Sequence, residues 1–289
     1  MGKILIDPGD LVAVDAPTYL GAIQAFSPYQ PSYVEIATDN DGVIPESLEH
    51  VLSQHDVKLV YLVPTFQNPT GRTLTLERRH RIAEIIAEHG ALLIEDDPYS
   101  ALRFRGDPLP TVKSLAPDHV VYISTLSKVF APGLRLGFTV APKTIRDWLV
   151  IAKQGVDLHT STLNQALAAE YITGGYLAEQ IPKIVELYRP KQQRLLRALT
   201  EDLPSGFTWS EPEGGMFVWV EGPDQFDMDP VYERAVRDGA AFVPGKYFFA
   251  GPDRGRSTMR LNFTTATDEQ IGDAVSIIGR AIDAEMNSL

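Results

Sequence analysis

The sequence contains no cysteine among its 289 residues. Disulfide bonds, thiolate nucleophiles and cysteine metal sites are therefore excluded. No apolar run approaches the length of a membrane span, and the first ten residues, MGKILIDPGD, lack the long apolar core of a secretory signal peptide. These absences predict a cytoplasmic protein with no membrane partner.

Positive charge is also scarce. The chain has 26 Lys and Arg against 38 Asp and Glu, which gives a formal net charge of −12. Long-range repulsion disfavours nucleic acid or an anionic membrane as the partner of such a protein. The one dense basic cluster is ERRHR, residues 77–81, and its pattern predicts a solvated helix face. The sequence therefore predicts no nucleic-acid partner.

Two common ligand-binding motifs are missing. There is no HExxH or other paired-ligand spacing among the six histidines, which predicts no zinc site. No glycine-rich spacing precedes Lys128, so there is no Walker loop. The carboxylates of residues 95–97 are ambiguous by themselves, since such a cluster can hold Mg²⁺ or cap a helix.

The composition that remains is that of a globular protein with a large core, 44% hydrophobic and 22% charged. Apolar runs in the first half predict strands, several of them apolar on both faces, as a buried parallel sheet requires. They are residues 11–15, 33–37, 58–63, 91–95, 120–124 and 135–140. Between two of them, residues 76–90 have the pattern of a helix that stops at Gly90. This alternation predicts a layered α/β domain.

The pattern changes after Lys153. Helical periodicity dominates residues 161–199, and strand-like segments, a helix near residues 230–237 and a last helix follow. The second half therefore predicts a smaller α+β unit attached through a long helix. We expect a large domain at residues 1–185 and a small C-terminal domain at residues 186–289.

Polar residues follow several of the predicted strands. In α/β proteins, ligands bind outside the carboxyl ends of the strands. The segments concerned are FQNPTG with Asn68, EDDPYS with Asp96 and Tyr99, and STLSK with Thr125, Ser127 and Lys128. A lysine, hydroxyl groups suited to phosphate, an asparagine, a tyrosine and an aspartate are the parts that pyridoxal 5′-phosphate (PLP) chemistry uses.

Seven motifs in order carry a family resemblance: APTYLGA, PTFQNPTG, EDDPYS, STLSKVFAPGLRLGF, KQGVDLHT, PEGGMFVW and MRLNF. With them the sequence resembles the PLP-dependent class I/II aminotransferases of fold type I, and within these the 2-aminoadipate and aromatic aminotransferase branch. The resemblance implies an α/β fold with a mostly parallel sheet flanked by helices, and a smaller C-terminal α+β domain. It also implies a homodimer, because fold-type-I sites form at a two-fold interface.

The resemblance assigns roles around the cofactor ring. Lys128 resembles the lysine that anchors PLP covalently and then moves protons. Asp96 would keep the pyridine nitrogen protonated, Tyr99 and Asn68 would donate to the phenolic oxygen, and Tyr19 would stack on the ring face. Lys128, Asp96 and Tyr99 are thus the expected catalytic residues.

It also assigns the two anion sites. Arg135, Thr125 and Ser127 would bind the cofactor phosphate, with Thr125 standing where the family commonly has serine. Arg260 of MRLNF would bind the substrate α-carboxylate with both arms of its guanidinium, assisted by Asn68. No metal is implied.

The resemblance implies transfer of an amino group from an α-amino acid, which can be 2-aminoadipate, leucine-like or aromatic, to a 2-oxo acid such as 2-oxoglutarate. Family members carry a further segment before the position of Met1, with a phosphate-binding turn and a helix over the substrate pocket, so we expect that this chain lacks it. Two alternatives are the aminotransferase-like effector domain of a winged-helix transcription regulator and an inactive fragment.

Overall fold

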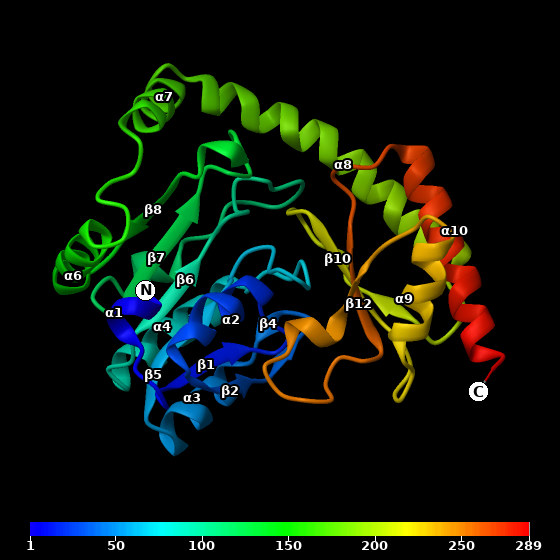
Figure 1. Cartoon of the computed structure of the whole chain (residues 1–289), viewed down its shortest axis with the longest axis horizontal. Coiled ribbons are helices and arrows are strands. Elements are labelled where there is room, and N and C mark those ends of the chain that lie inside the picture. Colours follow the sequence, from blue (N-terminus) through cyan, green and yellow to red (C-terminus); the bar gives the residue numbers. More distant parts are fainter. Residues whose placement is uncertain (289) are drawn as a thin grey trace.

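The computed structural model describes residues 1–288, and a six-stranded sheet forms the centre of its first half (Figure 1). Its strand order is β2-β1-β5-β6-β7-β8. The strands are β1 (Leu11–Asp15), β2 (Ser32–Ile36), β5 (Val57–Leu62), β6 (Leu93–Asp96), β7 (Val120–Thr125) and β8 (Gly137–Val140). All neighbours pair in parallel except β7 and β8, which are antiparallel. The predicted mostly parallel sheet is confirmed.

Apolar side chains on both faces of the sheet explain why these strands lie inside the protein. Ala13 and Val60 pack against α3 (Pro45–Gln54) and α4 (Leu76–Glu88) on one face. Val12, Val14 and Ile94 belong to the cluster on the other face, next to α2 (Leu20–Phe26). Each of these five side chains is completely buried, so the sheet is a rigid support for the residues at its edge.

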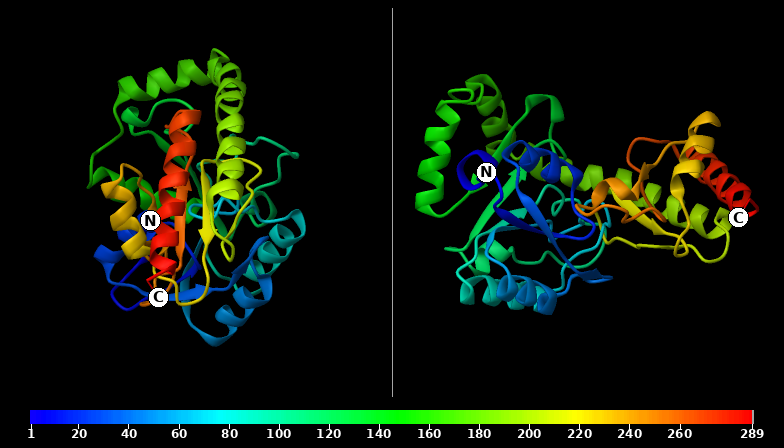
Figure 2. Two further views of the ribbon diagram at one scale, coloured as in Figure 1. Left: turned by 90° about the vertical axis from the view of Figure 1, so that its right-hand side faces the viewer. Right: turned by 60° about the horizontal axis from the view of Figure 1, so that its bottom comes forward.

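Shorter elements complete the first half. They are α1 (Gly2–Leu5), α5 (Val112–Leu115), α6 (Lys143–Gln154), α7 (Thr162–Thr173), the 3₁₀ turns η1 (Ser27–Tyr29) and η2 (Pro132–Leu134), and the pair β3 (Thr38–Asp39) and β4 (Gly42–Val43). The long helix α8 (Tyr176–Asp202) then runs from this part of the molecule to the next, and Figures 1 and 2 show the two chain ends in different parts.

The C-terminal part contains a second, antiparallel sheet of order β11-β12-β10-β9. Its elements are β9 (Thr208–Trp209), β10 (Phe217–Glu221), α9 (Met228–Arg237), β11 (Val243–Pro244), the 3₁₀ turn η3 (Gly245–Phe248), β12 (Thr258–Asn262) and α10 (Asp268–Met286). Val218, Leu261 and Ile278 share its core with Leu199 of α8. The α+β unit on a long helix is therefore confirmed.

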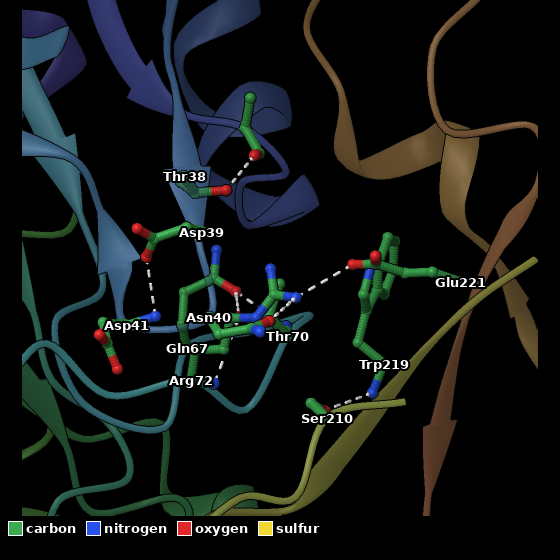
Figure 3. Close-up of polar contacts among 11 residues, drawn as sticks. Thr38, Asp39, Asn40, Asp41, Gln67, Thr70, Arg72, Ser210, Trp219 and Glu221 are labelled. Carbon is green, nitrogen blue, oxygen red and sulfur yellow. Dashed lines mark hydrogen bonds and ion pairs between the residues drawn. The ribbon is translucent and has the colours of Figure 1, made fainter. Parts of the chain in front are cut away.

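Polar contacts hold the two parts together. Arg72 Nη2 lies 3.0 Å from Asn40 Oδ1 and 3.1 Å from Glu221 Oε1, so it bridges the parts (Figure 3). At another point, Glu35 Oε2 on β2 lies 2.5 Å from Arg254 Nη1. These contacts keep the C-terminal part against the carboxyl ends of the first sheet.

One expectation for α4 is wrong. The pattern of the ERRHR segment predicts a solvated helix face, but Arg79 is only 1% exposed. Its guanidinium donates four hydrogen bonds of 2.7–3.0 Å, to the carbonyl oxygens of Leu74, Pro64 and Pro110 and to Thr65 Oγ1. Arg79 lies on the same face of the helix as Ile82 and Ile86, which are completely buried. Within the described residues, no helix combines the length and apolar character needed to cross a membrane.

Candidate active site

A cavity of about 350 Å³ opens at the carboxyl ends of β5, β6 and β7, and this volume is in the range of small-molecule sites. All the site residues expected from the sequence line it, apart from Arg260. They are Tyr19, Asn68, Asp96, Tyr99, Thr125, Ser127, Lys128 and Arg135. The sheet therefore brings together side chains that lie up to 116 positions apart in the chain, from Tyr19 to Arg135.

Lys128 follows β7 and lies half-buried in this cavity. Burial lowers the pKa of its ammonium group, and the positive charges of Arg135 and Arg260 lower that pKa further. Each effect disfavours the protonated amine. Lys128 is thus more readily available than a surface lysine as a nucleophile and as a proton acceptor.

Asp96 ends β6 and accepts a hydrogen bond of 2.6 Å from the Tyr61 hydroxyl through its Oδ2 atom. Burial raises the pKa of Asp96 to about 6, while the bond from Tyr61 acts in the opposite direction. At neutral pH the group is therefore mainly a carboxylate. Burial and the charge of Asp96 raise the pKa of Tyr61 well above its usual value, so the proton of the pair stays on the tyrosine.

Arg260 on β12 reaches the first half of the chain from the C-terminal part. Its Nη1 atom donates to Asn68 Oδ1 at 2.8 Å. The guanidinium carbon lies 4.2 Å from the ring centre of Phe217 and 5.0 Å from that of Phe248. None of the ion pairs found in residues 1–288 involves Arg260, and its buried Nε atom has no hydrogen-bond partner there. A largely buried cation in this state is suited to bind an anionic ligand.

Tyr99 and Asn68 form the wall of the cavity nearest to Arg260. Tyr99 is 4% exposed and packs edge-on against Phe217 at 5.8 Å. Burial raises the pKa of its hydroxyl, so Tyr99 stays a hydrogen-bond donor at neutral pH. Because Asn68 Oδ1 accepts from Arg260, its Nδ2 group is left to donate to a ligand.

Hydroxyl groups and an arginine form another part of the wall. Thr125 Oγ1 lies 2.9 Å from Ser127 Oγ and accepts from the Ser127 backbone N–H at 3.1 Å. Arg135 has a left-handed backbone with φ of 53°, which is uncommon for a residue with a side chain and often marks a functional site. Donors and a cation in one place are suited to phosphate.

Gln67 is a residue that the sequence did not single out. Its Nε2 atom donates to Asp15 Oδ2 at 2.9 Å and to the Pro17 carbonyl at 2.7 Å. Its Oε1 atom accepts from the backbone and hydroxyl of Thr70 (Figure 3). Gln67 therefore ties the segment before Tyr19 to the turn that carries Asn68. The only signal in the sequence was a polar residue in the short segment that follows an apolar strand.

Comparison with known proteins now gives the family. The family model "Aminotransferase class I and II" matches residues 2–278. The aromatic-amino-acid aminotransferase 1 of Thermococcus litoralis is 44% identical over 99% of this chain and 70% of its own length. The crystal structure of a multiple substrate aminotransferase from Thermococcus profundus superposes with a TM-score of 0.96 at 43% identity, covering 100% of this chain and 73% of that one.

A third similar protein is the α-aminoadipate aminotransferase LysN of Thermus thermophilus, whose structure contains N-(5′-phosphopyridoxyl)-L-leucine. It has a TM-score of 0.95 and 38% identity, covering 100% of this chain and 75% of that one. The fold and the cavity define a PLP-dependent transferase of fold type I. The chain belongs to the class I and II aminotransferases, and it is a PLP-dependent transaminase. The regulator-domain alternative is not favoured by these matches.

The residues of the cavity fit PLP. A lysine with a lowered pKa can anchor the aldehyde, a half-buried carboxylate lines the cavity, and hydroxyl groups with an arginine suit the phosphate. The donors Tyr99 and Asn68 suit the phenolic oxygen. The buried guanidinium of Arg260 lies beside Asn68, where the carboxylate of an amino acid would supply its missing partner.

Proposed function

We propose that the enzyme transfers the amino group of 2-aminoadipate, a leucine-like or an aromatic amino acid to a 2-oxo acid such as 2-oxoglutarate. The printed names of the similar proteins support this range, since they include an aromatic, a multiple substrate and an α-aminoadipate aminotransferase. The observation that carries the proposal is Arg260. It is a largely buried cation next to a cavity that contains a lysine with a lowered pKa, as an α-amino acid requires.

We assign the chemical roles as follows. Bound PLP supplies an electron-withdrawing ring that stabilises negative charge at the substrate Cα. Lys128 would anchor the cofactor, and its Nζ atom would then take the proton from the substrate Cα and deliver it to the cofactor carbon that carries the amino nitrogen. Arg260 holds the carboxylate with two parallel hydrogen bonds, which fixes the direction of the Cα–H bond. Asp96 places negative charge beside the ring nitrogen and keeps it protonated.

The other residues of the cavity bind and orient the cofactor in this proposal. Tyr99 and the Asn68 amide donate to the phenolic oxygen, and Tyr19 packs on the ring face. Ser127 donates to the phosphate oxygens, and Thr125 does so once its hydroxyl releases the Leu136 carbonyl, to which it donates at 3.0 Å in this structure. Arg135 neutralises the phosphate charge. Among the described residues 1–288, its guanidinium has a hydrogen bond of 3.4 Å to the Pro132 carbonyl and no other, so it is available for a stronger partner. These nine assignments are predictions about residues that surround one site.

A panel of amino donors compared with the Arg260→Lys variant tests the proposed function. Lysine keeps the charge but loses the planar pair of donors, so kcat/KM for each accepted amino acid should fall about 10- to 100-fold. Activity should be measured with 2-aminoadipate, leucine, phenylalanine and tyrosine as donors and 2-oxoglutarate as acceptor. Each donor should be paired with the amine that lacks its carboxylate.

The slow reaction of those amines should not change in Arg260→Lys, because they have no carboxylate to bind. Arg256→Lys is the matched control, since Arg256 lies just before β12 and pairs with Asp227 and Asp253 on the surface. Equal losses for amino acids and amines would contradict the assignment of Arg260. A protein that uses none of the donors in the panel would contradict the proposed function itself.

We also propose that the enzyme is a homodimer. Support comes from large apolar side chains exposed on β8, α6, the segment after it and α7. Trp148 is 58%, Ile151 59%, Val156 67% and Leu163 67% exposed. Isolated monomers rarely expose so many apolar groups on elements that follow one another in the chain, and a two-fold interface would cover these groups on both subunits.

The Trp148→Asp variant should weaken the dimer. A charge placed in an apolar interface, together with loss of a tryptophan anchor, should raise the dissociation constant roughly 30-fold or more. Light scattering over a concentration series measures this constant. Val236→Asp on α9, where Val236 is 46% exposed in the C-terminal part, is the control and should leave the dimer unchanged. A wild-type protein that stays monomeric with PLP bound would contradict the proposal.

The boundary between the proposed domains, 1–185 and 186–289, falls inside α8. Leu177 and Ile184 in the first half of this helix pack with the cluster around Leu126, which belongs to the first part. Leu195 and Leu199 in its second half pack in the core of the C-terminal part. Ile181 and Tyr188 contact both clusters, and Val185 belongs to the C-terminal core, so the packing changes gradually over residues 181–188, which include the proposed boundary. The cytoplasmic location expected from the sequence stays a prediction.

A further inference from the structure

Two neighbouring aspartates each receive a hydrogen bond from a tyrosine on an adjacent strand. The Tyr61 hydroxyl on β5 donates to Asp96 Oδ2 at 2.6 Å, and the Tyr122 hydroxyl on β7 donates to Asp97 Oδ2 at 2.9 Å. Of the two aspartates, Asp96 lines the cavity. Asp97 points to the opposite side, as successive residues of an extended chain do, and also accepts from the Ser100 backbone N–H. A hydrogen-bonded tyrosine–aspartate pair therefore occurs once at the cavity, as Tyr61 and Asp96, and once beside it, as Tyr122 and Asp97.

Tyr61 has little freedom to move. Its side chain is 2% exposed, and its ring packs edge-on against Phe26 with 5.9 Å between the ring centres. Its backbone is in the centre of the sheet, where Tyr61 pairs with Val14 on one side and Ile94 on the other. A side chain fixed in this way holds its hydroxyl at one point, so the bond to Asp96 fixes the carboxylate as well.

The bond decides which oxygen of Asp96 is left for a ligand. Oδ2 is occupied by Tyr61, whereas Oδ1 accepts no hydrogen bond from any side chain or backbone group described in residues 1–288. We propose that Tyr61 is a positioning residue that turns Asp96 so that Oδ1 receives the N–H of the pyridine ring. This inference rests on the proposed role of Asp96 as the partner of that nitrogen.

The bond also favours the charged form of Asp96. Burial and the nearby charge of Asp97 raise the pKa of Asp96, and the hydrogen bond from Tyr61 lowers it. When that bond is removed, burial and the charge of Asp97 raise the pKa of Asp96 without opposition. The neutral form of Asp96 then becomes more populated at neutral pH. A neutral Asp96 would hold the protonated ring less well. Tyr61 therefore acts on both the direction and the charge of the same group.

The Tyr61→Phe variant tests this, because it removes the hydroxyl and keeps the buried ring. Binding should be measured by equilibrium titration of the cofactor-free protein with PLP and with an analogue in which carbon replaces the ring nitrogen. The affinity for PLP divided by the affinity for the analogue should fall about tenfold in Tyr61→Phe. A purely structural effect would weaken both ligands equally and leave this ratio unchanged. As a second readout, kcat of the loaded enzyme should fall while KM changes little.

Tyr122→Phe is the matched control, since it removes the same kind of bond from Asp97, and its affinity ratio should equal that of the wild type. Asp96→Ala separates the inference from the assignment on which it rests. A ratio that collapses in Asp96→Ala but not in Tyr61→Phe overturns the role of Tyr61 and leaves Asp96 in place. A ratio unchanged in Asp96→Ala overturns the role of Asp96, and that of Tyr61 with it.

Discussion

Replacing Lys128 by alanine should abolish covalent attachment of PLP and lower the rate of transamination on the order of 10⁴-fold or more. The amine of Lys128 has two functions, and the substitution removes both. Alanine cannot bond to the aldehyde of the cofactor, and it cannot take the proton from the substrate Cα. The lowered pKa of Lys128, caused by burial and by Arg135 and Arg260, makes this amine suited to both. Borohydride reduction of the loaded protein, followed by peptide mapping, should place the cofactor on the peptide that contains Lys128.

Two control variants separate the loss of a positive charge from the loss of the nucleophilic amine of Lys128. Lys128→Arg keeps a positive charge in the cavity, yet it should be as inactive as Lys128→Ala, because a guanidinium is not a nucleophile at neutral pH. Lys143→Ala on α6 removes an exposed lysine that pairs with Asp147, and it should leave activity and labelling unchanged. Labelling that persists in Lys128→Ala, or a labelled peptide that lacks Lys128, would show that another residue anchors the cofactor.

The sheet could be predicted because a buried parallel sheet leaves a local signal. Residues 11–15 and 58–63 are apolar in almost every position, since helices cover both faces, and the structure places β1 at Leu11–Asp15 and β5 at Val57–Leu62. The residues of the site could be predicted for a related reason. Asn68, Asp96 and Lys128 each follow such a run, and the ends of neighbouring parallel strands meet at one edge.

The partners of these residues could not be predicted, because they depend on the order of the strands. Tyr61 reaches Asp96 across 35 positions of the chain, and Gln67 reaches Asp15 across 52. In the sequence, Tyr61 is a tyrosine in a strand and has the pattern of a core residue. Only the pairing of β5 with β6 brings its hydroxyl to the carboxylate. The antiparallel direction of β8 is likewise set by its pairing with β7.

The prediction for Arg79 failed for a different reason, because the charged residues around it indicate a surface position whereas its side chain is buried. A run of charged residues usually lies on the surface, and Arg81 in the same segment does pair with Glu49 there. Arg79 differs because its side of α4 faces the loop that leads to the site. Its four hydrogen bonds go to residues 64, 65, 74 and 110, so one side chain holds three stretches of backbone. No pattern of neighbouring residues contains that information.

We therefore expect the Arg79→Met variant to be strongly destabilised. Methionine can fill much of the space, but it donates no hydrogen bond, so three backbone carbonyls and the Thr65 hydroxyl would lose a partner in the interior. A buried polar group left without a partner costs about 1–3 kcal/mol. The acceptors can relax in part towards other donors, so we expect the free energy of unfolding to fall by about 4 kcal/mol. Equilibrium denaturation by urea, monitored by circular dichroism, measures this change.

The loss should also reach the active site, because residues 64 and 65 lead directly to Gln67 and Asn68. Below the denaturation midpoint, Arg79→Met should bind PLP more weakly than the wild type, since the turn that holds Asn68 is less well fixed. Arg81→Met, two residues further along the same helix, removes surface ion pairs only and should leave both the unfolding curve and PLP binding nearly unchanged. If the two variants unfold at the same urea concentration, the four bonds of Arg79 contribute nothing net to stability. That result would mean that water or backbone relaxation replaces them, and that the other contacts of this loop, such as those of Gln67 with Asp15 and Pro17, are enough to hold it.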